Sequence, residues 1–272
     1  MGDFETGMLR AGKLQLVDPS AALQRTPGWV ISADAGSSLE YLETREYTPG
    51  DDLRTIDWHA AARTERLMVK RYHRESLVHL DLVIDTSASM SLSADKKRAM
   101  GQLAGFWWTC ARNAGFSAQM WRLSDGCLLM PVWDEHLHQA EFKSFDPGFV
   151  QWQNNGIRIL ISDLMWPEEP ERVVARLAQG ASAFLMLQVL AELDVNPGFQ
   201  GWVQLEHLET GELLDVLFDE RARTEYQRNL TRFQDVFRDL AERYRGQFGV
   251  VLAEGFVAGA SFSDEIARLW LK

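Results

Sequence analysis

The chain has 272 residues, of which 46% are hydrophobic and 25% charged, a composition typical of globular proteins with a large core in one or two domains. Lys and Arg number 28 against 39 Asp and Glu, and the resulting net charge of -11 argues against nucleic acid or an anionic membrane surface as a partner. The only cysteines, Cys110 and Cys127, exclude a disulfide framework and a zinc ribbon and predict a reduced, cytoplasmic protein.

The first forty residues carry little pattern. Residues 1–6 lack the regions of a signal peptide, and they fit the myristoylation pattern only formally, because their acidic flank favours a chance match. We expect a short helix near residues 20–23 and turns around Pro27 and Gly36. No apolar run in the chain approaches the roughly 18 residues of a membrane span, so we expect no membrane anchor.

Residues 41–64 are dense in charged and turn-forming residues. Pro49 and Gly50 fit the central positions of a type II turn, and a short helix carrying Trp58 follows. Basic and acidic side chains alternate here: Arg45, Asp51, Asp52, Arg54, Asp57 and Arg63. The simplest interpretation is a salt-bridged turn that docks Ile56 and Trp58 on a neighbouring surface. A catalytic carboxylate pair is less favoured, because every acid has a basic neighbour.

After a strand at residues 67–72, the chain enters the apolar run 78–84, which ends at Asp85. A buried strand followed by a polar turn is how open α/β sheets present ligand sites. Asp85, Ser87 and Ser89 alternate, so their oxygens can face one point, and such hard donors suit a cation like Mg²⁺. A strand that ends in a helix-capping Ser/Asp cluster explains the same residues equally well.

A helix from Ser93 to Gly115, a strand at 116–123 and an antiparallel companion at 127–132 follow. Strand, helix and strand in this order predict a right-handed crossover and a parallel sheet. Residues 133–155 interrupt the pattern. His136 and His138 with two neighbouring acids suggest a metal cluster, but a solvated loop is favoured, because side chains two apart do not share a helix face.

A second apolar strand, residues 157–161, ends in Ser162 and Asp163. Two parallel strands that both finish in an acid place Asp85 and Asp163 at the same sheet edge. Since isolated carboxylates so close would repel, a shared cation is the economical arrangement.

The remaining elements are architectural. We expect a helix at 167–179, a strand at 183–190, a hairpin insertion at 201–218, a long helix at 219–244, a strand at 248–252 and a final helix at 263–271. The apolar stripe of the long helix is typical of a helix that covers a sheet.

Together these residues resemble a known family. Asp85-Thr86-Ser87-Ala88-Ser89 resembles the Asp-x-Ser-x-Ser element of the metal-ion-dependent adhesion site in von Willebrand factor type A domains. The upstream block is similar to the signature of the bacterial domain-of-unknown-function family fifty-eight, in which such a block precedes such a domain. Its matching residues are Arg45, Gly50, Asp51, Asp52, Arg54, Asp57, Trp58 and Arg63, for which a structural role is expected.

The resemblance covers residue 35 to the end and implies an α/β fold: a Rossmann-like, mostly parallel sheet flanked by helices, with an N-terminal extension and a β-hairpin insertion. We expect residues 1–76 to form the extension and residues 77–272 the von Willebrand factor A-like domain. The resemblance also implies that Asp85, Ser87, Ser89 and Asp163 hold Mg²⁺.

One ligand of the family's site is not found. The adhesion site usually takes a threonine from a loop between the two acid-bearing strands, but Thr109, inside the predicted helix, is the only threonine between Thr86 and Asp163. Ser144 or Asp146, in the irregular loop, is a candidate substitute; without a substitute, the site is weakened or binds nothing.

Two functional hypotheses follow. The first is a non-enzymatic protein-interaction module, in which a partner's Asp or Glu completes the coordination of the cation. The resemblance implies that it works with a MoxR-type AAA+ ATPase in protein assembly or maturation. The alternative is a magnesium-dependent phosphatase-like hydrolase that uses Asp85. It is less favoured, because Ser87 stands where such enzymes need an acid-base Asp and no lysine occurs in the neighbouring turns.

Overall fold

The computed structural model describes residues 2–19, 39–48, 56–64, 66–74, 78–124, 126–134, 150, 152, 154–166, 168–206 and 211–272. The chain divides into two compact units, one formed by Met1–Thr26 with Val78–Lys272 and the other by Pro27–Leu77. The larger unit resumes at Val78, where the expected division was at residue 77. The expected extension 1–76, however, is not one unit, because its first segment packs with the α/β part of the chain.

The smaller unit is an antiparallel strand pair with one helix. Strands β1 (Leu39–Glu46) and β2 (Met68–Arg74) pair along their length, and helix α3 (Trp58–Thr64) lies between them in sequence. The predicted short helix is therefore present. Asp57 begins it: its Oδ1 accepts hydrogen bonds from the backbone N–H groups of His59 and Ala60, two of the donors that a helix start leaves unsatisfied.

The larger unit is built on a six-stranded sheet in the order β10-β7-β6-β3-β4-β5. Its strands are β3 (His79–Asp85), β4 (Ser117–Ser124), β5 (Gly126–Met130), β6 (Gly156–Ser162), β7 (Ala181–Leu190) and β10 (Gly246–Leu252). All neighbouring pairs are parallel except β4 with β5. The predicted mostly parallel α/β sheet is confirmed.

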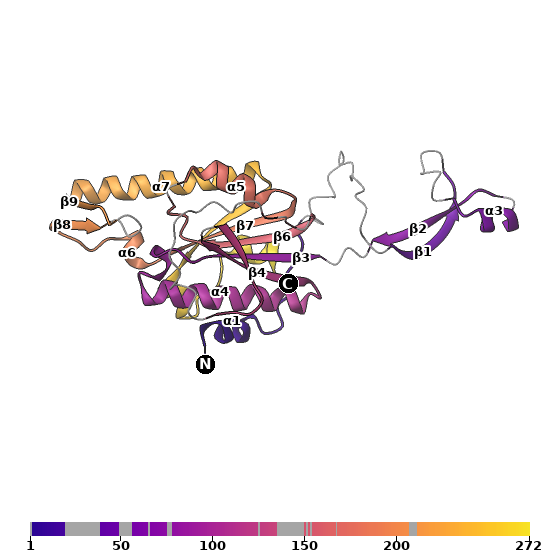
Figure 1. Cartoon of the computed structure of the whole chain (residues 1–272), viewed down its shortest axis with the longest axis horizontal. Helices are drawn as coiled ribbons and strands as arrows, with labels where there is room; N and C mark the ends of the chain where they lie inside the picture. Colours follow the sequence, from indigo (N-terminus) through magenta and orange to yellow (C-terminus); the bar gives the residue numbers. More distant parts are fainter. Residues whose placement is uncertain are drawn as a thin grey trace. The chain divides into compact units, whose positions relative to one another are not determined.

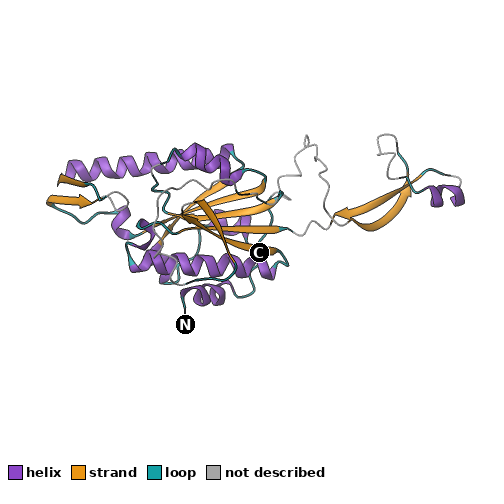
Figure 2. Ribbon diagram, in the orientation of Figure 1, coloured by secondary structure: helices purple, strands orange, loops and turns teal. Residues whose placement is uncertain are grey.

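Helices cover both faces of this sheet, as Figures 1 and 2 show. Helix α4 (Ala94–Asn113) lies along one face, with the shorter α1 (Asp3–Ala11), α8 (Ala253–Val257) and α9 (Asp264–Trp270) beside it. Helices α5 (Pro170–Ala178) and α7 (Glu220–Arg243) cover the other face. Because both faces are covered, every residue of the central strands β3 and β6 is buried, which explains their continuous apolar runs.

Helix α1 was not predicted, and its contact with α4 depends on two glycines. A Cβ atom on Gly105 of α4 would lie 2.0 Å from the carbonyl oxygen of Phe4, and one on Gly7 of α1 would lie 2.0 Å from that of Gln102. The helices can therefore approach backbone to backbone only with glycine at these positions. This contact places the first helix in the α/β unit. The helix expected near residues 20–23 lies outside the described residues.

The predicted hairpin consists of β8 (Gly201–Glu206) and β9 (Leu213–Phe218), which form a separate two-stranded sheet. With the short helix α6 (Glu192–Val195), it connects the end of β7 to the start of α7. It therefore stands at the edge where the parallel strands finish (Figure 1). Across the described residues, no helix combines the length and apolar composition that crossing a membrane requires.

Candidate functional site

The candidate site lies where β3 and β6 end side by side. These strands are parallel neighbours with Ile84 opposite Ile161, so the next residues, Asp85 and Ser162, are adjacent. The Ser162 hydroxyl donates a hydrogen bond of 2.6 Å to Asp85 Oδ2. Asp85 is only 1% exposed. The end of β6 therefore fixes one oxygen of the Asp85 carboxylate.

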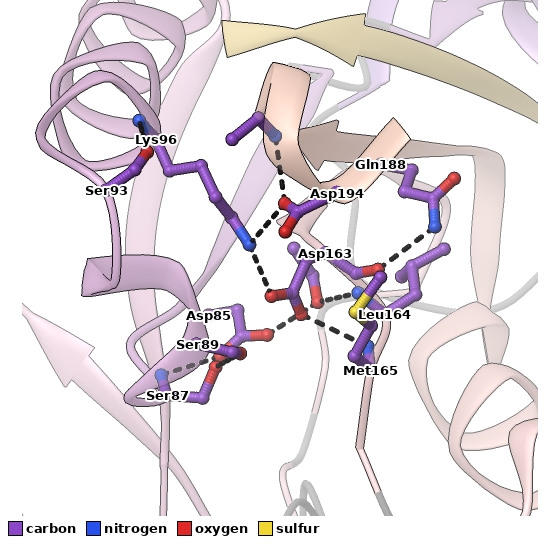
Figure 3. A network of polar contacts seen from close by, with 12 residues as sticks. Asp85, Ser87, Ser89, Ser93, Lys96, Asp163, Leu164, Met165, Gln188 and Asp194 are labelled. Atoms are coloured by element: carbon purple, nitrogen blue, oxygen red, sulfur yellow. Dashed lines mark hydrogen bonds and ion pairs between the residues drawn. The ribbon is translucent and has the colours of Figure 1, made fainter. Parts of the chain in front are cut away.

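The turn after β3 brings the two serines to the same place (Figure 3). The backbone N–H of Ser87 donates to Asp85 Oδ1 at 2.8 Å, and the Ser87 and Ser89 hydroxyl oxygens are 3.0 Å apart. Ser89 opens a single 3-10 turn, Ser89–Ser91, whose central Met90 is buried in the core. The alternating residues Asp85, Ser87 and Ser89 thus gather their oxygens in one small region, as the sequence pattern predicts.

Asp163 follows β6, and two hydrogen bonds hold its side chain and its backbone carbonyl. Its Oδ1 accepts a hydrogen bond from the Met165 N–H at 3.1 Å, and its backbone carbonyl accepts one from Gln188 Nε2 of β7 at 3.1 Å. Leu164 has a positive φ of 64°, an unusual backbone conformation for a leucine that turns the chain sharply after the acid. Asp163 is therefore fixed at the same sheet edge as Asp85.

A buried lysine, which the sequence pattern does not single out, completes the cluster. Lys96 Nζ lies 2.8 Å from Asp163 Oδ2 and 3.2 Å from Asp194 Oδ2, and its side chain is 2% exposed. Lys96 belongs to the first turn of α4 rather than to the turn after β3, and Ser93 caps this helix by accepting a hydrogen bond from the Lys96 N–H. Asp194, on α6, was not predicted either; its Oδ2 also accepts from the Ala191 N–H.

The two acids differ in their electrostatic surroundings. Burial raises the pKa of Asp85 to about 7, with a further rise from the charge of Asp163, although hydrogen bonds from Ser162 and Ser87 oppose the rise. Burial alone would lower the pKa of Lys96, but the charges of Asp163 and Asp194 outweigh it, and the net shift is upward. Lys96 is therefore charged at neutral pH and compensates Asp163. The described residues include no ion-pair partner for Asp85.

The residues around Asp85 fit a hard divalent cation. The carboxylate and the hydroxyls of Ser87 and Ser89 are oxygen donors of the kind that Mg²⁺ prefers, and a cation there would balance a buried negative charge. Asp163 is less available, because Lys96 already contacts it. In the part of the chain that the structure describes, no group of three or more His, Cys, Asp or Glu residues is arranged to hold a metal. The site would thus depend on the two hydroxyls.

The missing threonine ligand is not replaced by Thr109. This residue lies in the last turns of α4, whereas Lys96 lies in the first, so roughly 20 Å of helix separates it from the site. Ser144 and Asp146, the candidate substitutes, and His136 and His138 all lie outside the described residues.

Only part of the upstream signature block can be placed. Asp57 caps α3, Arg63 is in its last turn, and Trp58 is 68% exposed. The bulk of the block, Gly50, Asp51, Asp52, Arg54 and the side chain of Arg45, lies outside the described residues.

A second buried charge cluster lies near the other end of β3, on the same face as Asp85. Asp81 accepts a hydrogen bond from Trp121 Nε1 at 2.8 Å, contacts His79 Nε2 at 3.1 Å and lies 3.6 Å from an Arg158 guanidinium nitrogen. Burial lowers the pKa of Arg158 to about 10, against the opposing effect of Asp81. Arg158 also donates to the carbonyl of Gln179 just after α5, so this cluster ties the helix to the sheet.

The chain is similar to proteins whose printed descriptions give no function. Residues 43–139 match the profile of a family described as protein of unknown function DUF58. Uncharacterized proteins of Mycobacterium bovis and Mycobacterium tuberculosis are 24% identical over 216 residues, which cover 71% of this chain and 68% of each relative.

A crystal structure of a conserved hypothetical protein, BatB from Bacteroides thetaiotaomicron, aligns with 71% of this chain and 98% of its own at 13% identity, with a TM-score of 0.35. The sequence matches show a similarity to the DUF58 family over residues 43–139.

Proposed function

We propose that the chain is a non-enzymatic protein-interaction module that binds its partner through the edge where β3 and β6 end, with Mg²⁺ held by Asp85, Ser87 and Ser89. The observation that carries this proposal is the Asp85 carboxylate, which is buried beside two hydroxyl oxygens and has no cation partner among the described residues. A bound cation would supply the missing charge and keep a coordination position open toward solvent.

The partner that fits this chemistry is a protein that presents an Asp or Glu side chain. Its carboxylate would complete the coordination of the cation, so that recognition requires both the metal and the partner's acid. From the resemblance to family fifty-eight, we infer that this partner is a MoxR-type AAA+ ATPase, with which the chain acts in protein assembly or maturation in the cytoplasm.

The alternative, a phosphatase-like hydrolase with Asp85 as nucleophile, has less support. Asp85 is 1% exposed, which leaves little room for a phosphate group to reach its carboxylate. Ser87 cannot serve as the acid-base group expected two residues later. Lys96 contacts Asp163 rather than Asp85, so it does not stabilise a phosphorylated Asp85.

The proposal is tested by capture of a purified MoxR-type ATPase from the same organism on the immobilised chain, in 5–10 mM MgCl₂, on the order used for weak Mg²⁺ sites, or in EDTA. We expect the wild type to capture the ATPase in Mg²⁺ but not in EDTA. Asp85→Ala should capture no ATPase in either condition, and its circular dichroism spectrum should match that of the wild type. Asp95→Asn, which changes an acid of α4 that pairs with Arg98, is the matched control and should behave as the wild type.

Equal capture in Mg²⁺ and in EDTA by the wild type and by Asp85→Ala would contradict the proposal. Turnover of p-nitrophenyl phosphate that requires Mg²⁺ and disappears in Asp85→Asn would support the hydrolase instead.

A further inference from the structure

The position of Lys96 is unusual for a lysine, because its charge is held in the protein interior. The side chain is 2% exposed, and a buried ammonium is retained only where opposite charges and hydrogen bonds compensate its lost hydration. Two carboxylates do so: Asp163 from the end of β6 and Asp194 from α6. The ammonium therefore lies between two acids, as Figure 3 shows.

The elements around Lys96 hold this arrangement firmly. Ser93 caps α4 by accepting a hydrogen bond from the Lys96 N–H, and this bond fixes the position of the Lys96 backbone. Asp194 is held through its backbone, since the Tyr226 hydroxyl of α7 donates to its carbonyl at 2.5 Å. The lysine thus connects three elements at the sheet edge: the start of α4, the end of β6 and helix α6.

We propose that Lys96 is a built-in cation that restricts metal binding at this edge: its ammonium engages Asp163 and Asp194, and a divalent cation is left with Asp85, Ser87 and Ser89. Removal of the ammonium leaves Asp163 and Asp194 free to bind a cation, which strengthens metal binding at this edge. This inference rests on the proposed position of the cation site and adds what limits its affinity. It also assigns Asp194, which the sequence pattern does not single out, as a latent ligand.

The physical basis is the charge and the number of ligands. With Lys96 in place, the three acids and the lysine carry a net charge of -2 when all are ionised, and the ammonium repels a second cation nearby. Without it the net charge is -3, and two carboxylates lose their partner. Affinity of oxygen sites for divalent cations rises with the number of charged ligands.

The test is Mn²⁺ binding, followed by electron paramagnetic resonance of the free ion, and Mg²⁺ binding, followed by calorimetry, at pH 8. We expect Lys96→Met to bind Mn²⁺ about tenfold or more tightly than the wild type. Lys97→Met is the matched control, because the neighbouring Lys97 is exposed and should leave the affinity unchanged. Adding Asp194→Asn to Lys96→Met should remove most of the gain.

Equal Mn²⁺ affinity of Lys96→Met and Lys97→Met would overturn the inference, as would a gain that persists with Asp194→Asn. If Lys96→Met fails to fold in EDTA, circular dichroism during Mn²⁺ titration decides: recovery of the folded spectrum supports the inference, and no recovery overturns it. A wild type that shows no Mg²⁺-dependent capture of the ATPase, together with a gain in Lys96→Met, would refute the proposed function and leave this inference standing.

Discussion

Asp85→Asn tests the electrostatics of the site without any partner. The amide has the shape of the carboxyl group, so its oxygen still accepts from the Ser87 N–H and its NH₂ group faces the Ser162 hydroxyl. What the change removes is the titration of a buried acid whose pKa is raised from 3.8 to about 7. The stability of the variant should therefore depend on pH differently from that of the wild type.

The sign follows from proton linkage. A carboxyl whose pKa is higher in the folded state holds its proton more tightly there. The stabilising contribution of Asp85 to the free energy of unfolding is therefore complete below pH 3.8 and is lost as the pH rises through about 7. The shift of about 3 pH units corresponds to about 4 kcal/mol, roughly two thirds of it lost above pH 5. Relative to the wild type, Asp85→Asn should gain about 3 kcal/mol between pH 5 and pH 8.

The assay is urea unfolding followed by tryptophan fluorescence at pH 5 to 8 in EDTA, with Asp95→Asn as the control whose difference from the wild type should stay constant. At pH 8, Mg²⁺ at a hundred times its dissociation constant should stabilise the wild type by about 2.7 kcal/mol. It should not stabilise Asp85→Asn. A difference between wild type and Asp85→Asn that is the same within about 0.5 kcal/mol from pH 5 to pH 8 would refute the electrostatic argument.

Three further outcomes can be measured. Ser162→Ala removes a hydrogen bond to the Asp85 carboxylate, so it should raise the pKa of Asp85 further and cost about 1–3 kcal/mol at pH 8, read from the same urea series. Gly105→Ala should destabilise the chain by about 1–3 kcal/mol and speed amide exchange in α1, because the new methyl group meets the α1 backbone. In a chain lacking residues 1–12 the same change should instead stabilise α4 by about 1 kcal/mol, since alanine is the better helix former; destabilisation in both chains would show that α1 is not the cause. Burial, with the nearby charge of Asp81, raises the pKa of the Cys127 thiol to about 12, so iodoacetamide at pH 8 should modify it far more slowly in the native chain than in urea, by mass spectrometry; equal rates would contradict this.

The sheet and its ligand-facing edge were predictable because the signals were local. Strands β3 and β6 are buried at every position, so each appears in the sequence as one continuous apolar run that ends in polar residues. Parallel strands that end in acids bring those acids together by geometry alone. The convergence of Asp85, Ser87, Ser89 and Asp163 needed no long-range information beyond the pairing of two strands.

Lys96 could not be predicted because nothing local distinguishes it from Lys97. Both lysines stand in the first turn of α4, and only the fold decides that one faces Asp163 and Asp194 while the other faces solvent. A lysine in such a position is usually solvated, since its burial requires acids that are distant in the sequence. The sequence therefore predicted that a bound metal ion would balance the acids, whereas the chain itself supplies a cation, the Lys96 ammonium.

Helix α1 was missed for a related reason. Its nine residues include Gly7, which weakens a helix in isolation, and a helix this short is marginal alone. The glycine is favourable only because the backbone of α4 lies against it. A residue that argues against a helix in the sequence is thus the one that lets this helix pack.

The docking of α1 on α4 also constrains the order in which the protein folds. Helix α1 ends at Ala11 and its docking surface begins at Ala94, with the whole smaller unit encoded between them. During synthesis α1 therefore leaves the ribosome long before α4 exists, and a helix of this length is marginal alone. Contacts between such distant segments form slowly, because the intervening chain must first be closed into a loop. We expect α1 to join the core last, after the sheet has formed around β3.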